Sequence, residues 1–201
     1  MSELQRWEDR FAEPGYWYGT EANAFLKAQA HLLKPGQGVL AVADGEGRNG
    51  VWLAEQGLDV LSVDISPTAL AKAWALAADR GVALRTQEAD ITQWEWPTAC
   101  FDVVAVIFIQ WATADQIPSL FAGMKQALKV GGLLLLHGYR AEQLKYGTGG
   151  PKQVDRLYTR AMLEVAFGGF AQLDIREHDD MVSEGRGHAG MSALIDLIGR
   201  K

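Results

Sequence analysis

Short apolar runs alternate with longer amphipathic stretches along the chain from about residue 38 onward. Each apolar run is bounded by Gly, Pro, Asp or Asn, which are residues that favour turns. Spacings of roughly 20 to 30 residues between runs suit a strand, a crossover helix and the next strand. The pattern therefore predicts βαβ units, with parallel strands that begin near Val39, Leu58, Val82, Val103 and Leu133.

Two of these runs, residues 103–107 and 133–136, are apolar without alternation, which is typical of central strands covered by helices on both faces. Ser66 followed by Pro67 predicts the start of a helix, and Gly81 predicts its end. Between residues 112 and 130, apolar side chains at steps of three and four mark one buried helix face that ends at Gly131 and Gly132. These side chains are Ile117, Leu120, Phe121, Met124 and Leu128.

Both ends of the chain depart from this rhythm. After residue 170, Leu173 and Ile175 alternate with polar residues, a polar loop follows, and residues 193–198 form an apolar run, so we expect an antiparallel pair that completes the sheet. The first 35 residues hold six aromatic side chains; Trp7 and Phe11 fit one helix face, which either packs on the core or covers a ligand. Without a linker, we expect one domain over residues 1–201, with a helical cap (1–35) on a core (36–201).

A glycine-rich segment, residues 44–50, joins the first predicted strand to a helix that begins near Val51. Gly45 and Gly47 lack side chains where backbone must approach a ligand, and the helix start offers N–H groups to an anion. The sequence predicts a nucleotide-like ligand here, and a tight turn without a ligand is the alternative. Gly45, Gly47 and Gly50 also satisfy the G-x-G-x-x-G dinucleotide fingerprint, which is a weak signal alone.

Acidic residues follow the next two predicted strands. Asp64 ends the second strand, where a carboxylate can accept two hydrogen bonds from a ribose diol; its alternative role is to cap the helix after Ser66. Asp90 and Ile91 follow the third strand, where an acid could hold an exocyclic amine and an apolar side chain could flank an adenine ring. S-adenosylmethionine and NAD both suit Asp64, and the residues after the third strand favour S-adenosylmethionine.

Composition narrows the function classes. The formal net charge is −6 and no run of Lys and Arg offers a surface to phosphates, which disfavours a nucleic-acid partner. The apolar runs are too short to cross a bilayer, and the N-terminus does not resemble a signal peptide. A lone cysteine, Cys100, cannot form an internal disulfide or a multi-cysteine metal site. We expect a cytoplasmic protein with no membrane partner and no metal.

The ordered motifs resemble those of class I S-adenosylmethionine-dependent methyltransferases across roughly residues 36 to 140. They are the glycine-rich turn, Asp64, Ala89-Asp90, Phe101-Asp102-Val103-Val104 and Leu128-Lys129-Val130-Gly131-Gly132. A narrower resemblance, to small bacterial methyltransferases of the tellurite-resistance and thiopurine S-methyltransferase groups, rests on residues 18–23, 45–49 and 146–151.

The resemblance implies a doubly wound α/β fold with a seven-stranded sheet of order 3-2-1-4-5-7-6 and an antiparallel seventh strand. It implies that the turn from Ala43 to Gly47 holds the methionine end of S-adenosylmethionine, that Asp64 holds the ribose and that Asp90 and Ile91 hold the adenine. Two residues depart from the family pattern, since Ala41 stands where an acid is common and Ala43 stands where the first glycine is usual. The further residues expected at the cofactor are Tyr18, Asp44, Asn49, Ile65, Phe108 and Trp111.

Methyl transfer requires collinear placement of donor and nucleophile more than it requires a dedicated base. A soft thiolate or chalcogen acceptor attacks unaided, whereas an alcohol or amine generally needs a proton acceptor. The candidates for that role are His137, Tyr146 and His188, each with the alternative of a loop hydrogen bond. The loop over residues 145–152 is expected either to close over the site or to form an exposed connection.

The sequence thus predicts a methyltransferase that acts on a small-molecule acceptor as a monomer or weak homodimer. Two other functions stay open. One is an NAD(P)-dependent oxidoreductase, which is disfavoured because Glu46 inside the turn would face a pyrophosphate. The other is a non-catalytic module that binds the same cofactor.

Overall fold

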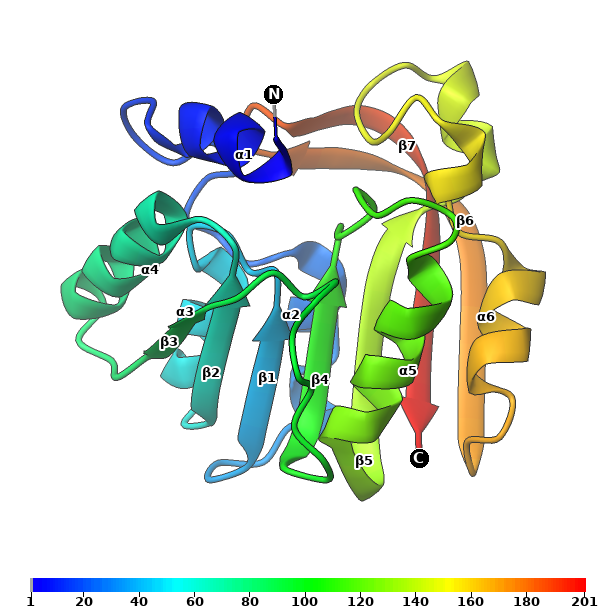
Figure 1. The fold of residues 1–201 in the computed structure, drawn as a ribbon, viewed down its shortest axis with the longest axis horizontal. Coiled ribbons are helices and arrows are strands. Elements are labelled where there is room, and N and C mark those ends of the chain that lie inside the picture. The colour runs from blue at the N-terminus through cyan, green and yellow to red at the C-terminus, as the bar shows by residue number, and fades with distance from the viewer. Residues whose placement is uncertain (1) are drawn as a thin grey trace. The chain divides into compact units, whose positions relative to one another are not determined.

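A computed structural model describes residues 2–201 and places seven strands in one sheet of order β3-β2-β1-β4-β5-β7-β6 (Figure 1). The strands are β1 (Gly38–Val42), β2 (Asp59–Asp64), β3 (Arg85–Glu88), β4 (Phe101–Ile107), β5 (Leu128–Tyr139), β6 (Gln172–Glu184) and β7 (His188–Arg200). The helices are α1 (Glu3–Phe11), α2 (Ala24–Ala28), α3 (Arg48–Glu55), α4 (Pro67–Asp79), α5 (Ile117–Ala127) and α6 (Arg160–Phe167), with short 3-10 helices at Ala30–Leu32, Ala141–Lys145 and Val154–Arg156.

The pairing of the strands confirms the predicted fold. β1 pairs with β2 and β2 pairs with β3 in parallel, and β4 pairs with β5 in parallel. β7 runs antiparallel to β5. The protein therefore has the doubly wound α/β fold, with the strand order and the antiparallel seventh strand that the family resemblance implied.

The chain forms two compact units. The first unit comprises the chain up to Trp94 together with Glu184–Gly187, and the second comprises Glu95–Ser183 and His188–Lys201. Unit 1 holds the glycine-rich turn, and unit 2 holds the late strands with α5 and α6. The expectation of a single domain stays a prediction.

In unit 1, α4 begins at the predicted Ser66–Pro67 pair, where the Ser66 hydroxyl accepts a hydrogen bond from a backbone N–H of the first turn. Gly81 follows the helix with a φ of 68°, which a glycine adopts without the steric cost of a Cβ atom. The strand expected near Val82 begins only at Arg85. Val82 instead packs against the apolar cluster of α3 and α4, so it completes the packing of that helix pair.

In unit 2, α5 carries the predicted buried face but ends at Ala127. Leu128, which the periodicity placed on the helix, has an extended backbone with a ψ of 133° and opens β5 opposite Phe101. Leu128 is fully buried, which suits both a buried helix face and a covered strand. Apolar periodicity alone therefore could not locate this helix end.

The polar loop expected after Ile175 is mostly strand. β6 extends to Glu184 and β7 begins at His188, which leaves only residues 185–187 as the turn. β6 is the last strand in the sheet order, and most of its side chains are exposed. An edge strand with little burial needs no apolar pattern, and for this reason its sequence resembles a loop.

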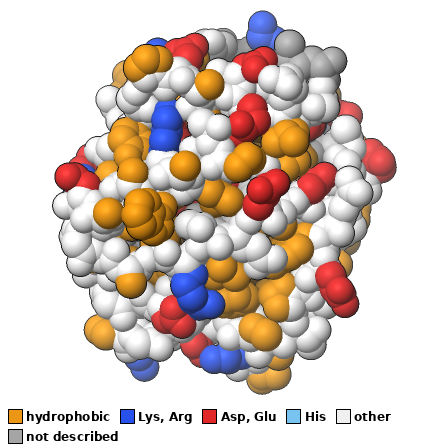
Figure 2. Space-filling model, turned by 60° about the vertical axis from the view of Figure 1, so that its left-hand side comes forward, with side chains coloured by type: hydrophobic (Ala, Val, Ile, Leu, Met, Phe, Trp, Pro, Cys, Tyr) orange, Lys and Arg blue, Asp and Glu red, His pale blue; other side chains and the backbone are white. Residues whose placement is uncertain are grey.

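Within residues 2–201, no helix has the length and apolar character needed to cross a membrane. On the face drawn in Figure 2, Lys and Arg side chains stand singly among acidic and apolar side chains. That face offers no continuous basic stripe of the kind that follows a phosphate backbone.

Candidate functional site

The glycine-rich turn leaves β1 at Val42 and enters α3 at Arg48. Three of its residues, Ala43, Gly45 and Gly47, have left-handed backbone conformations, with φ of 47°, 60° and 86°. Ala43, which stands where the family usually has glycine, thus adopts a conformation that costs an L-residue about 1–2 kcal/mol. Strain at a non-glycine residue of this kind concentrates at functional sites.

Asp64 lies directly against this turn. Its Oδ2 accepts a hydrogen bond from the Gly45 N–H at 2.8 Å, and its Oδ1 accepts one from the Ser66 N–H at 2.9 Å. The carboxylate and the side-chain-free bend therefore converge on one place. Each oxygen still has a second lone pair, so the same carboxylate can accept hydroxyl donors from a diol. The residues present fit the ribose of an adenosine-bearing cofactor.

Burial raises the pKa of Asp64 to about 6, against the lowering effect of the bonds from Ser66 and Gly45. Asp64 is only 6% exposed. At neutral pH it is largely ionised and can accept charge-assisted hydrogen bonds, which contribute about 1.5–3 kcal/mol each.

Asp44 stabilises the turn through hydrogen bonds of its side chain. Its carboxylate accepts hydrogen bonds from the Ser62 hydroxyl at 2.9 Å and from the Gly50 N–H at 3.1 Å. A Cβ at Gly50 would lie 2.4 Å from an Asp44 oxygen, which explains the third glycine of the fingerprint. Burial raises the pKa of Asp44 to about 7, and the nearby Asp64 charge adds to this effect. Asp44 thus serves the shape of the turn.

Two polar side chains of the turn bind the N-terminal segment. The Glu46 carboxylate, 3% exposed, accepts hydrogen bonds from the Trp17 N–H at 2.6 Å and the Tyr18 N–H at 3.4 Å, and pairs with Lys72 at 2.9 Å. Asn49 accepts one from the Asn23 N–H at 2.9 Å. Because Glu46 is neutralised by Lys72, its charge is not the obstacle to a pyrophosphate that the sequence suggested.

The other unit 1 residues expected at the cofactor lie beside the turn or at the end of β3. The Tyr18 hydroxyl accepts a hydrogen bond from Arg10 at 3.0 Å, and burial raises the pKa of Tyr18. Ile65, which follows Asp64, is half-buried. Asp90 accepts bonds from the N–H and hydroxyl of Thr92 at 2.9 and 2.7 Å, and Ile91 is buried. Asp90 is thereby fixed in orientation just beyond the end of β3.

In unit 2, four aromatic rings from β5, β7 and the residue that follows β4 pack together. Phe108 has a left-handed φ of 55° and stacks on His188 with ring centroids 4.2 Å apart. Its ring also lies 4.6 Å from those of His137 and Tyr139. The Tyr139 hydroxyl and His188 Nδ1 share a hydrogen bond of 2.8 Å. His188, a candidate proton acceptor, is thus held by a ring and by a hydroxyl.

The remaining candidates from the sequence have structural partners. His137 Nδ1 lies 2.6 Å from Asp196, whose other oxygen contacts His178 at 3.0 Å. The Tyr146 hydroxyl donates to Asp179 at 2.8 Å on an exposed surface. All three candidates therefore have partners within unit 2, and a role in chemistry stays a prediction for each of them.

Trp111 and the loop over residues 145–152 are the last two features that the sequence suggested for the site. Trp111 is half-buried, and its backbone carbonyl accepts a hydrogen bond from Arg156 at 2.9 Å. In the loop over residues 145–152, the Thr148 hydroxyl donates to the Met191 carbonyl, and a Cβ at Gly190 would lie 2.6 Å from Thr148. The loop is fixed to β7 in this conformation. Whether it closes over a site stays a prediction.

Sequence reasoning missed Glu8, whose carboxylate binds the Thr68 hydroxyl at 2.6 Å beside Asp64 and Ser66. It also missed the buried ion pair between Arg48 and Glu184 at 2.6 Å. Charged residues on a helix and on a polar hairpin usually lie in solvent, so neither pair has a sequence signal.

Comparison with known proteins identifies related methyltransferases. Residues 39–132 match the family described as a methyltransferase domain. The chain is 34% identical over 112 residues to phosphoethanolamine N-methyltransferase 3 of Arabidopsis thaliana, a match that covers 53% of this chain and 22% of that enzyme. It is 39% identical over 87 residues to glycine/sarcosine N-methyltransferase of Parasynechococcus marenigrum (strain WH8102). This match covers 42% of this chain and 29% of that enzyme. The matches thus span less than a third of each of these two relatives.

Solved structures show the same fold at low identity. TehB from Haemophilus influenzae superposes with a TM-score of 0.73 at 18% identity, over 97% of this chain and 67% of that one. The N-methyltransferase NodS from Bradyrhizobium japonicum WM9, solved with S-adenosyl-l-homocysteine, superposes with a TM-score of 0.69 at 15% identity. The superposition covers 98% of this chain and 97% of that one. Residues 39–132 therefore match a methyltransferase domain, and the sheet has the strand order of the class I S-adenosylmethionine-dependent methyltransferase fold, which confirms the broader of the two resemblances seen in the sequence.

Proposed function

We propose that this protein is an S-adenosylmethionine-dependent methyltransferase that acts on a small-molecule acceptor. The observation that carries the proposal is the 2.8 Å hydrogen bond between Asp64 and the Gly45 N–H, because it joins a diol-binding carboxylate to a bend without side chains. The matched methyltransferase domain over residues 39–132 includes both residues.

The proposed contacts with the cofactor are assigned around the Asp64–Gly45 hydrogen bond. The turn from Ala43 to Gly47, with Asp44 and Asn49, borders the methionine end, Asp64 and Ile65 hold the ribose, and Asp90 with Ile91 holds the adenine. Bound S-adenosylmethionine would supply a methyl group activated by its sulfonium. The further lining residues are proposed to be Tyr18, Phe108 and Trp111.

The protein's own contribution to methyl transfer is then positioning, exclusion of water and, for some acceptors, removal of a proton. We propose that His188, oriented by Tyr139, accepts the proton when the attacking atom is an amine or an alcohol. A thiolate or chalcogen acceptor would need no such group. The relatives are named for N-methylation, so an amine acceptor is tested beside the thiol and chalcogen acceptors that the sequence suggested.

The first experiment measures binding by calorimetry. Wild-type protein should bind S-adenosylhomocysteine, and Asp64→Ala should weaken this binding by more than tenfold, because it removes hydrogen bonds that contribute about 1.5–3 kcal/mol each. Asp59→Ala is the matched control, since Asp59 lies on the same strand with an exposed side chain paired to Arg85. Unchanged affinity in Asp64→Ala would remove Asp64 from the site, and binding of NAD or NADP instead would support the oxidoreductase.

The second experiment separates an enzyme from a non-catalytic binding module. Release of S-adenosylhomocysteine is measured with glycine, sarcosine, phosphoethanolamine, small thiols, selenite and tellurite as acceptors. Turnover of the amines should fall in His188→Gln, while turnover of thiols should not. Cofactor binding without turnover of any acceptor would favour the module.

We also propose that the protein acts in the cytoplasm, as a monomer or weak homodimer and without nucleic-acid or membrane partners. The net charge of −6 and the single cysteine support this proposal. Sedimentation equilibrium tests the oligomeric state.

A further inference from the structure

An N-terminal strap, residues 2–23, lies on the glycine-rich turn and on α4. It consists of α1 and the segment that follows it. Phe11 at the end of α1 is 2% exposed, and a Cβ at Gly45 would lie only 3.4 Å from its ring. The strap therefore covers the bend to which the proposed function assigns the methionine end of the cofactor.

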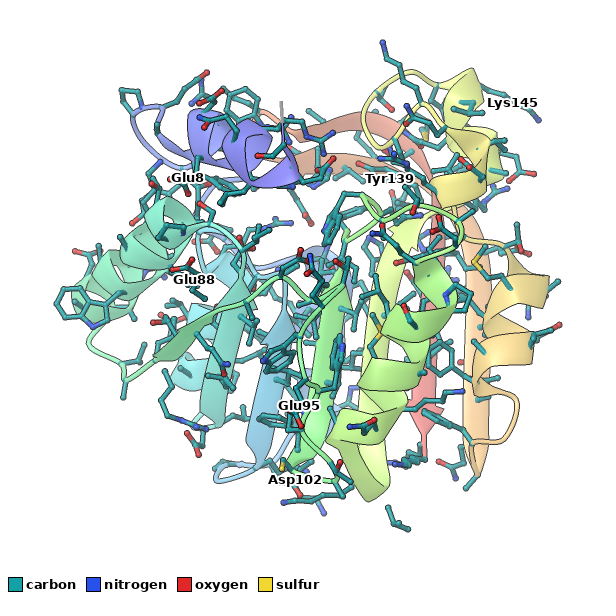
Figure 3. All side chains as sticks on the ribbon, in the orientation of Figure 1. Glu8, Glu88, Glu95, Asp102, Tyr139 and Lys145 are labelled. Carbon is teal, nitrogen blue, oxygen red and sulfur yellow. The ribbon has the colours of Figure 1, made fainter. Side chains whose placement is uncertain are left out.

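Glu8 fastens the strap to the start of α4. Its carboxylate accepts hydrogen bonds from the Ser66 hydroxyl, from the Thr68 N–H at 3.2 Å and from the Thr68 hydroxyl at 2.6 Å. Figure 3 shows Glu8 extending from α1 towards this end of α4. Because the Ser66 hydroxyl itself caps the helix through the Ala69 N–H at 3.0 Å, α4 can form without Glu8. The Glu8 contacts thus attach the strap and are not needed to start the helix.

The Glu8 attachment adjoins the proposed ribose site. Ser66 donates its N–H to Asp64 at 2.9 Å and its hydroxyl to Glu8. One residue therefore binds both carboxylates, and movement of the strap would change the surroundings of the group that would hold the ribose.

A second attachment comes from the turn itself. Glu46 accepts hydrogen bonds from the Trp17 and Tyr18 N–H groups, and Lys72, its ionic partner, also donates to the Glu13 and Gly15 carbonyls at 2.8 and 2.6 Å. If the strap lifted, the Glu46–Lys72 pair at 2.9 Å would remain. A buried carboxylate that keeps a charged partner makes such an opening reversible, since no unpaired buried charge is left.

The hairpin turn between β6 and β7 holds the strap from the other side. A Cβ at Gly185 would lie 2.4 Å from the Tyr18 backbone, so glycine is required for this approach. Arg186 pairs with Glu13 at 2.9 Å, but both side chains are about half exposed, and such pairs are weak. The contacts of Glu8 and Glu46 are thus stronger attachments of the strap than the Arg186–Glu13 pair.

We propose that residues 2–23 form a lid over the cofactor site, latched by Glu8, that lifts to admit and release the cofactor. This inference rests on the proposed function. Loss of the latch should speed both opening and release, whereas a covalently closed lid should block exchange.

The first test measures the dissociation of S-adenosylhomocysteine by stopped-flow, using tryptophan fluorescence. Glu8→Ala should release the ligand about tenfold faster than wild type, as expected for the loss of charge-assisted hydrogen bonds. Glu3→Ala is the matched control, because Glu3 lies on the same helix and pairs locally with Arg6 in an exposed ion pair. Glu3→Ala should release the ligand at the wild-type rate.

The second test closes the lid covalently. The variant Glu8→Cys with Thr68→Cys is made in a Cys100→Ser background, since Cys100 is an exposed free thiol. When oxidised, it should bind S-adenosylhomocysteine at least tenfold more slowly than when reduced with dithiothreitol. The reduced form should fold normally and provides the internal control.

Two results would overturn the inference, and they are distinguishable. If wild type binds S-adenosylhomocysteine but Glu8→Ala and the oxidised double-cysteine variant exchange it at wild-type rates, the lid is wrong and the proposed function stands. If wild type does not bind S-adenosylhomocysteine at all, the proposed function fails and the lid fails with it.

Discussion

At the residue scale, the proposed site depends on two carboxylates held against backbone. Asp64 binds the Gly45 N–H and Asp44 binds the Gly50 N–H, so each fixes part of one turn. Both have raised pKa values because they are buried, about 6 for Asp64 and about 7 for Asp44. The protonation of these groups therefore links pH to binding and to stability in the range where enzymes are assayed.

Cofactor affinity should fall on acidification. Ribose hydroxyls donate to an ionised carboxylate, and Asp64 with a pKa of about 6 is mostly protonated at pH 5. We expect the dissociation constant of S-adenosylhomocysteine, measured by calorimetry, to be about tenfold higher at pH 5 than at pH 8. In Asp64→Asn this pH dependence should be lost. An equal pH dependence in that variant would assign it to another group.

At the scale of elements, α5 shows how a close approach overrides helix propensity. Gly123 lies inside this helix, where glycine is about 1 kcal/mol less favourable than alanine. A Cβ at Gly123 would lie 2.4 Å from the ring of Trp96, which packs across the helix. Gly123 thus lowers the intrinsic stability of the helix but allows Trp96 to pack against α5.

Gly123→Ala should therefore destabilise the protein, although alanine is the better helix former. Overpacking of this kind typically costs about 1–3 kcal/mol, which exceeds the gain in propensity. Chemical denaturation should give a lower free energy of unfolding for Gly123→Ala than for wild type. When Trp96 is first changed to Ala, the added substitution should be neutral or stabilising. A stabilised Gly123→Ala single variant would contradict the packing argument.

At the scale of the whole molecule, stability should depend on pH through the buried acids of unit 1. Asp44 has a pKa of 3.8 in an ordinary setting and about 7 in the folded protein. Between these values the folded state retains a proton that the unfolded state releases. This contribution to stability is therefore complete below about pH 4 and is lost as pH rises to about 7.

Asp44→Asn removes this titration. Relative to the variant, wild type should lose on the order of a few kcal/mol of unfolding free energy between pH 4 and pH 7. Urea denaturation of both proteins at several pH values measures the difference. Parallel pH profiles would show that Asp44 does not titrate in this range.

The sequence by itself determined the order of the elements and the position of the turn. Apolar runs, caps and glycines are local signals, so the strand end at Asp64 and the start of α4 could be predicted from their neighbours alone, and the end of the first strand was predicted within one residue. Local signals could not separate the end of α5 from the start of β5, since Leu128 is buried either way. They predicted a strand at Leu173 and Ile175 but not its continuation to Glu184, because the exposed second half of an edge strand resembles a loop.

Only the tertiary structure decided which polar groups meet. Asp64 reaches Gly45 across 19 positions because β2 pairs with β1 in parallel register, and Glu8 reaches Ser66 across 58 positions because the strap folds back on α4. A carboxylate that is solvated and one that binds a distant hydroxyl have the same residue type and the same neighbours in sequence. Long-range hydrogen bonds of this kind are set by chain packing, so they become visible only when the fold brings the partners together.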